Sequence, residues 1–245
     1  MTSEVQKSVT SRDQVREVIP AVVVHVCRDR LGSRIRSLVL TGSLARGEET
    51  LLGTAKGWTL LGDGDFLAVS DHRGVTDEDC AGVCRESELS LAQQGIVAHI
   101  GIGLVRSHYF GRLRPSIFAY ELRQFGRVVT GDDRILCAIP AFAAGKIPLA
   151  DAYRLLGNRM IEQLEALVLP ASPPGKLPDE AQYAIAKLYL DTATSLLVFV
   201  GAYHEHGAIG VAHNLLGVRP KEVGAHRWAM RSDDDEISSP TFRFR

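Results

Sequence analysis

Two short apolar runs, each next to glycine or aspartate, restrict the fold of this chain more than any other feature. The first run, residues 37–41, predicts a buried strand, and Gly42 directly after it predicts a sharp turn into a helix. The second run, residues 65–70, predicts another strand that opens with Asp65, two positions after Asp63. The glycine-rich residues between the two runs, 51–62, predict a loop.

Helical and extended patterns alternate around these two strands. Ser11 is the expected N-cap of the first helix, and Thr76 with acidic residues after it is the expected N-terminus of the second. The patterns predict helices over residues 11–31, 76–94 and 115–125, and strands over residues 96–105 and 127–130. This alternation is typical of a sheet flanked by helices.

The second half of the chain has a different pattern. Leucines at helical spacing predict a helix over residues 149–169, and a second amphipathic helix is predicted over residues 181–203. The proline-rich residues 170–178 between them predict a linker. We therefore expect an α+β fold in which a mixed sheet flanked by helices (residues 1–140) is followed by a helical bundle (141–230) and a disordered tail (231–245).

Charge and composition exclude several classes of partner. The formal net charge of the 245 residues is −1, which gives no overall attraction to nucleic acid, so a nucleic-acid partner is not expected. The first residues are polar and no apolar run is long enough to span a bilayer, so no membrane partner is expected either. The four cysteines form no paired pattern, which favours reduced thiols and a cytoplasmic protein.

The residues that follow the first strand and open the second suit phosphate and metal chemistry. Gly42 lets the backbone approach a ligand closely, and the amides of the following helix with the hydroxyl of Ser43 can hold phosphate oxygens. Asp63 and Asp65 are two positions apart, so in an extended strand both carboxylates point to one face. Two such carboxylates repel each other unless a cation lies between them, and Mg²⁺ binds such oxygens together with nucleotide phosphates.

This combination resembles the DNA-polymerase-β-like nucleotidyltransferase superfamily. The resemblance covers a strand that ends in Gly42-Ser43, the segment Ala-Arg46-Gly-Glu48 and the pair Asp63-x-Asp65. The helical half is similar to the domain that follows in small-substrate members such as the aminoglycoside nucleotidyltransferases. The resemblance implies a Mg²⁺-dependent transfer of a nucleoside monophosphate, ATP being the favoured donor, to a hydroxyl of a small molecule or protein. It implies Asp63 and Asp65 as metal-binding catalytic residues, with Gly42, Ser43 and Arg46 binding the nucleotide.

The sequence departs from that superfamily in its third carboxylate. Members usually supply one from a later strand, and the candidate strand, residues 96–105, contains no Asp or Glu. The face that carries Val97, His99 and the two glycines would hold that position, so His99 or Glu121 remain as possible bases. The alternatives are a catalytically inactive protein that binds nucleotide or a partner, and a toxin-like nucleotidyltransferase that acts on RNA or protein.

Each of these residues also has a purely structural explanation. Ser43 is explained equally by an N-cap, and the two aspartates by a turn. Arg46 with Glu48 is explained by a solvated ion pair, and Glu121 by an exposed helix position. The same holds for Lys187 and Asp191, which four-residue spacing on a helix predicts as a surface pair.

Overall fold

The structure is a computed structural model, and it describes residues 11–166 and 177–203. Its helices are α1 (Arg12–Leu31), α2 (Gly42–Arg46), α3 (Asp77–Gln93), α4 (His108–Gly111), α5 (Ile117–Phe125), α6 (Leu149–Ala166) and α7 (Asp179–Phe199). Its strands are β1 (Ser37–Leu40), β2 (Leu51–Thr54), β3 (Gly57–Val69), β4 (Ile96–Val105) and β5 (Arg127–Gly131). Short 3₁₀ turns lie at Gly32–Arg34, Ile135–Ala138 and Ala144–Lys146.

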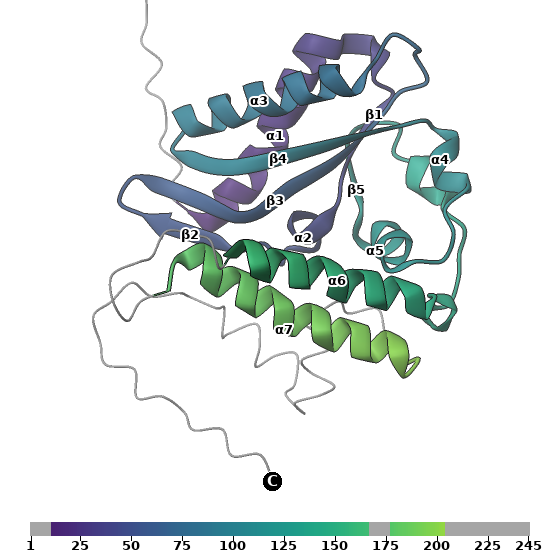
Figure 1. Cartoon of the computed structure of the whole chain (residues 1–245). Helices are drawn as coiled ribbons and strands as arrows, with labels where there is room; N and C mark the ends of the chain where they lie inside the picture. Colours follow the sequence, from purple (N-terminus) through teal and green to yellow (C-terminus); the bar gives the residue numbers. More distant parts are fainter. Residues whose placement is uncertain (1–10, 167–176, 204–245) are drawn as a thin grey trace, which may run out of the picture.

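The long strand β3 organises a mixed sheet (Figure 1). On one side β3 pairs in parallel with β4, and on the other it pairs antiparallel with β2 and then with β1. The strand order β2-β3-β1-β5 therefore ends at β5, which is antiparallel to β1. The expectation of an α+β protein with a mixed sheet and flanking helices is confirmed at this coarse level.

The expectation of a loop over residues 51–62 is wrong. These residues form the β2–β3 hairpin, in which Leu51 lies opposite Leu60. Glycine is required only at the turn, where Gly57 has a φ of 128° and a methyl group there would lie 1.9 Å from the Gly95 carbonyl oxygen. The rest of the hairpin follows from strand alternation, since Leu51 and Leu60 are both buried. Asp63 and Asp65 therefore lie in the middle of a strand and not at its beginning.

One face of the sheet is covered by α1 and α3. Helix α1 begins at Ser11, whose side chain forms a capping box with Gln14, and its buried stripe includes Val15, Ile19 and Val23. Helix α3 begins after Thr76 with a second capping box, as the sequence predicts. These helices pack on the alternate sheet residues that point their way, among them Phe66 and Ile100. The residues between, Asp63 and Asp65 included, therefore point to the other face.

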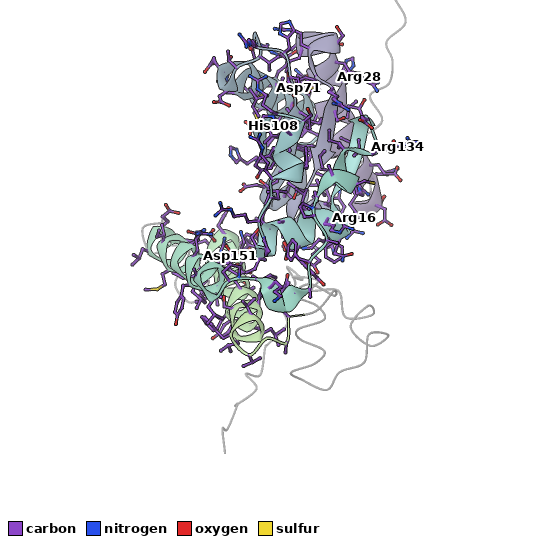
Figure 2. All side chains as sticks on the ribbon, turned by 90° about the vertical axis from the view of Figure 1, so that its right-hand side faces the viewer. Arg16, Arg28, Asp71, His108, Arg134 and Asp151 are labelled. Carbon is purple, nitrogen blue, oxygen red and sulfur yellow. The ribbon has the colours of Figure 1, made fainter. Side chains whose placement is uncertain are left out.

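That other face is approached by α2, α5 and the α6–α7 pair. A buried cluster of Tyr120 from α5 with Ile147, Ala152, Leu197, Val198 and Tyr203 joins α5 to the helical pair. Asp151 in the first turn of α6 also accepts a hydrogen bond of 2.7 Å from the Ile117 amide at the start of α5. Figure 2 shows the helical pair, with Asp151, as a layer of its own beside the sheet domain that carries Arg28 and Arg134.

The two long helices of the second half differ from expectation only at their ends. Helix α7 ends at Phe199 instead of residue 203, because Gly201 takes a φ of 68° and turns the chain. The predicted end of α6 at residues 167–169, most of the linker and the whole of residues 204–245 lie outside the described residues. Within the described ranges, every helix is too short or too polar to cross a bilayer.

Candidate functional site

Asp63 and Asp65 both point to the face of β3 opposite the α1–α3 layer, as two-residue spacing predicts. Asp63 is exposed and Asp65 half-buried. In the β3–β4 register, Asp63 lies opposite His99 and Asp65 opposite Gly101. The backbone of Asp65 also accepts a hydrogen bond of 2.9 Å from the Thr41 amide, which fixes the end of β1 beside it.

Gly42 makes a close approach to the Asp65 carboxylate. Its φ is 69°, a conformation that L side chains rarely adopt, and a methyl group there would lie 2.6 Å from Asp65 Oδ2. Both the backbone conformation and the space therefore require glycine. The sequence predicts that Gly42 lets the backbone approach a ligand, whereas the group that the structure places next to Gly42 is a carboxylate of the same chain.

Ser43 is the second residue of α2, and the N-cap is Thr41, so the explanation of Ser43 as an N-cap is wrong. The Ser43 hydroxyl lies near Gly62 and the hydroxyl of Tyr183 on α7. A methyl group on Gly62 would lie 2.6 Å from Tyr183 Oη and 3.9 Å from Ser43 Oγ. Burial, with the nearby Asp63 charge, raises the pKa of Tyr183 to about 12, so this hydroxyl keeps its proton at neutral pH.

Arg46 lies at the end of α2 between two carboxylates. Its Nε is 2.7 Å from Glu48 and its Nη1 is 2.8 Å from Glu121. Burial opposes the charge on Arg46, but Glu121 and Glu48 offset this and raise its pKa. The explanation of Arg46 with Glu48 as a solvated pair is therefore wrong, because the pair is largely buried and includes Glu121.

The expectation that Glu121 is an exposed helix residue is also wrong. Its carboxylate accepts a hydrogen bond of 3.0 Å from the Tyr203 hydroxyl in addition to the Arg46 contact. Burial raises the pKa of Glu121, and Arg46 together with Tyr203 opposes that rise. Glu121 thereby connects α2, α5 and the chain just beyond α7.

Lys187 and Asp191 do not form the surface pair that their spacing predicts. Asp191 lies 2.9 Å from Arg159 Nε on α6, and Lys187 lies 3.9 Å from Glu162. Lys187 is close enough to the sheet to act on it electrostatically, since it lowers the pKa of Asp65. Tyr183, Lys187 and Asp191 share one face of α7 because they are four residues apart. That four-residue spacing is the sequence signal that could have placed these α7 side chains together.

Burial and repulsion act together on Asp65. Burial contributes most and the Asp63 charge adds to it, while Lys187, Arg46 and His99 oppose both, and the resulting pKa is about 6. The neighbouring positive groups therefore do not fully offset burial and the Asp63 charge at Asp65. Two carboxylates placed in this way fit Mg²⁺, which proteins hold with one or two carboxylates together with substrate phosphates.

Strand β4 supplies no third carboxylate. His99, Gly101 and Gly103 lie on the face of β4 where such a carboxylate would stand, but His99 Nδ1 lies 2.9 Å from Glu88 of α3, with the His99 side chain 73% exposed. Within residues 11–166 and 177–203, no group of three His, Cys, Asp or Glu side chains lies close enough to hold a metal ion by itself.

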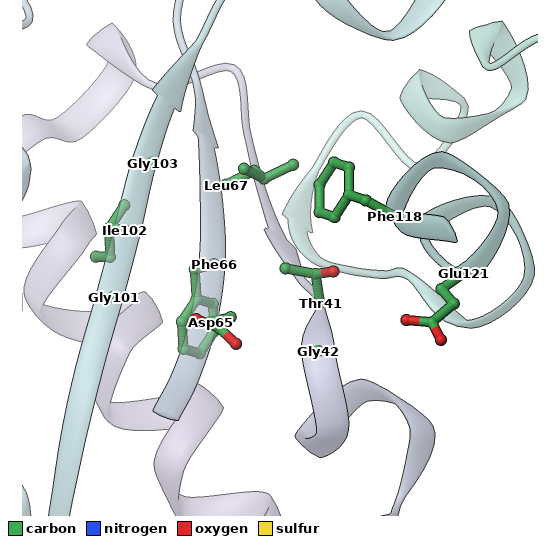
Figure 3. A pocket seen from close by; sticks show the side chains of 10 residues that line it. All are labelled: Thr41, Gly42, Asp65, Phe66, Leu67, Gly101, Ile102, Gly103, Phe118 and Glu121. Atoms are coloured by element: carbon green, nitrogen blue, oxygen red, sulfur yellow. The ribbon is translucent and has the colours of Figure 1, made fainter. Parts of the chain in front are cut away.

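A pocket of about 460 Å³ lies between the sheet and α5 (Figure 3). Asp65 and Glu121 both line it, and Figure 3 shows their carboxylates on either side of Thr41 and Gly42. Phe118 of α5 points toward Leu67 of β3 across the same space. A pocket of this size fits a small molecule next to Asp63 and Asp65, which we call the acidic pair.

The site therefore combines an acidic pair from β3, a glycine and a hydroxyl from α2, and a hydroxyl and a lysine from α7. The sequence matches no known protein-family model and no curated protein.

Proposed function

We propose that this protein is a Mg²⁺-dependent nucleotidyltransferase that moves a nucleoside monophosphate from a nucleoside triphosphate, ATP being favoured, to a hydroxyl of a small molecule or protein. The fold would then be of the nucleotidyltransferase type. Asp63 and Asp65 would be the catalytic metal ligands, and Gly42, Ser43 and Lys187 would surround the phosphates.

One observation supports the proposal above all others. The two aspartates project from the middle of β3 into a site where burial, together with the charge of Asp63, brings the pKa of Asp65 to about 6. A charge arrangement of this kind is costly unless a cation accompanies the ligand. The hydroxyls of Ser43 and Tyr183 and the ammonium of Lys187 stand nearby as donors for anionic oxygens.

The chemistry follows from these positions. The oxygen of the acceptor hydroxyl forms a bond to the α-phosphorus, and the bond from that phosphorus to the β-phosphate bridging oxygen breaks, so that its electron pair leaves with pyrophosphate. The hydroxyl proton passes to the Glu121 carboxylate, whose pKa burial raises. Mg²⁺, when bound with the nucleotide, would polarise the α-phosphate and neutralise charge on the leaving group. Arg46 would hold Glu121 in position.

The proposal is tested by titrating the protein with a non-hydrolysable ATP analogue, with and without Mg²⁺, in a calorimeter. We expect binding that requires Mg²⁺ and that falls by at least about tenfold, or roughly 1.4 kcal/mol, in Asp63→Asn plus Asp65→Asn. The matched control is Asp133→Asn, an exposed aspartate after β5, which should bind like the wild type. Equal nucleotide binding by the double variant and the wild type would contradict the proposal.

A second candidate function is nucleotide binding without catalysis. The observation that favours it is Gly101, which lies opposite Asp65 in the register where a third carboxylate would complete the metal site. Pyrophosphate release in the presence of Mg-ATP and a pool of acceptor alcohols separates the two candidates. Release that Glu121→Gln slows while nucleotide binding persists supports the enzyme, whereas binding without any release supports the second function.

A further inference from the structure

The pocket beside the acidic pair has one wall without side chains. Gly101 and Gly103 are alternate residues of β4 and line the pocket on the face that carries Asp65. Neither glycine has a positive φ, so the backbone does not require glycine at these positions. Glycine inside a strand weakens it, and it often marks a place where a ligand approaches the backbone closely. The two glycines therefore leave a flat strip of backbone facing the pocket.

The side chains nearest to this strip are those of Asp65 and Leu67. A methyl group on Gly101 would lie 3.4 Å from Asp65 Oδ1, and one on Gly103 would lie 3.4 Å from Leu67 Cδ2, so a methyl group fits at contact distance at either position. A larger side chain there would take up space in the pocket beside Asp65 or Leu67. The strip is flat because both residues are glycine, although the backbone conformation does not require glycine there.

The opposite wall is aromatic. Phe118 of α5 lines the pocket, and its side chain is 40% exposed, whereas its neighbours Ala119 and Leu122 on the same helix are buried. Figure 3 shows its ring directed toward Leu67 on the sheet. An aromatic ring and a strip of backbone on opposite walls suit a flat apolar ring, because both faces of such a ring gain contact.

The polar end of the pocket is acidic. Its charged lining residues are Asp65 and Glu121, and Thr41 adds a hydroxyl. A further negative charge would be repelled by these two carboxylates, while a hydroxyl can donate a hydrogen bond to either group.

We propose that this pocket is the acceptor site, and that the acceptor is an uncharged planar ring compound whose hydroxyl points toward Asp65 and Glu121. The ring lies between the Gly101–Gly103 strip and Phe118. The role of the ring compound as the acceptor rests on the proposed function, but its binding requires neither metal nor nucleotide. A ring held in this way directs its hydroxyl to the end of the pocket where the acidic pair lies.

Ligand-observed NMR tests the proposal with 2-naphthol and 4-hydroxybenzyl alcohol as probes, and with 2-naphthoate and 4-hydroxybenzoate as carboxylate counterparts. We expect saturation transfer to both neutral compounds and at least about tenfold weaker binding of both carboxylates. Gly103→Phe, which fills the strip, should abolish transfer. Val97→Phe is the matched control, because it lies on the same face of β4 about 20 Å away along the strand.

Three outcomes would overturn the proposal: no transfer to either neutral probe, equal binding of the carboxylates, or unchanged transfer in a folded Gly103→Phe variant. Phe118→Ala, which removes the other wall, should weaken binding on its own if Gly103→Phe does not fold. The nucleotide titration described above is run on the same variants. In the wild-type protein, Mg-nucleotide binding without ring binding refutes only the acceptor site, and ring binding without Mg-nucleotide binding refutes only the proposed function.

Discussion

The negative charge of Asp65 destabilises the folded protein locally. The pKa of this carboxyl is about 6 against an ordinary 3.8, with burial as the main cause and Asp63 as the second. Because the pKa is higher in the folded protein than in the unfolded chain, the folded state binds more protons between about pH 4 and pH 6. The free energy of unfolding therefore decreases as pH rises through that window and stays lower at neutral pH.

Asp65→Asn should accordingly stabilise the protein at pH 7 in the absence of metal. A shift of about two pKa units corresponds to at most about 3 kcal/mol, and solvent access reduces the expected gain to about 1–2 kcal/mol. Urea unfolding at pH 5 and pH 7 measures it, and the difference between variant and wild type should grow with pH. A gain that is equal at both pH values, or that Asp133→Asn reproduces, would show that the Asp65 charge is not its cause.

At the scale of elements, the turn from β1 into α2 joins the sheet to the site. Gly42 is the first residue of α2 and Gly47 is its C-cap, and the two have almost the same left-handed φ, 69° and 71°. They differ in their surroundings, since a methyl group on Gly47 meets nothing within 4 Å whereas one on Gly42 meets the Asp65 carboxylate. Comparing alanine variants at the two positions therefore separates the cost of the left-handed backbone from the cost of the contact with Asp65.

Gly47→Ala should cost about 1 kcal/mol of stability, which is the backbone contribution alone. Gly42→Ala should cost about 1–2 kcal/mol more, because Asp65 has to move, and it should weaken Mg-nucleotide binding, which Gly47→Ala leaves unchanged. Thermal unfolding and the nucleotide titration check both parts. Equal effects of the two variants would mean that Asp65 moves aside freely.

At the scale of the whole molecule, buried charged side chains hold the helical pair together, and polar and apolar contacts join it to α5. Arg159 of α6 is buried between Glu162 and Asp191, and Tyr203 beyond α7 binds Glu121 of α5. The same pair carries Tyr183 and Lys187 toward the aspartates. The geometry of the site therefore depends on how firmly α6 and α7 are held together.

Arg159→Met should destabilise the protein by about 3 kcal/mol, because it leaves the carboxylate of Asp191 largely buried without its partner. Arg154→Met, which breaks an exposed ion pair with Asp151 on the same helix, should cost less than about 1 kcal/mol. Chemical unfolding gives both values. Similar losses in the two variants would contradict a structural role for the buried pair.

Much of the framework could be predicted from short stretches of sequence. The capping boxes at Ser11 and Thr76, the alternation along β4 and the common face of Asp63 and Asp65 all depend on residues two to four positions apart. Over residues 51–62 the glycines obscure the strand pattern, so the sequence predicts a loop, and only pairing with the rest of the sheet decides in favour of a hairpin.

The sequence by itself determined the acidic pair, the glycine turn and the elements that carry them, because periodicity and capping act between near neighbours. Only the tertiary structure decided which groups surround that pair. Arg46 meets Glu121 across 75 residues, and Glu121 meets Tyr203 across 82. Such contacts follow from how whole layers pack, since the apolar cluster that docks α6 and α7 on α5 also brings Tyr203 to Glu121.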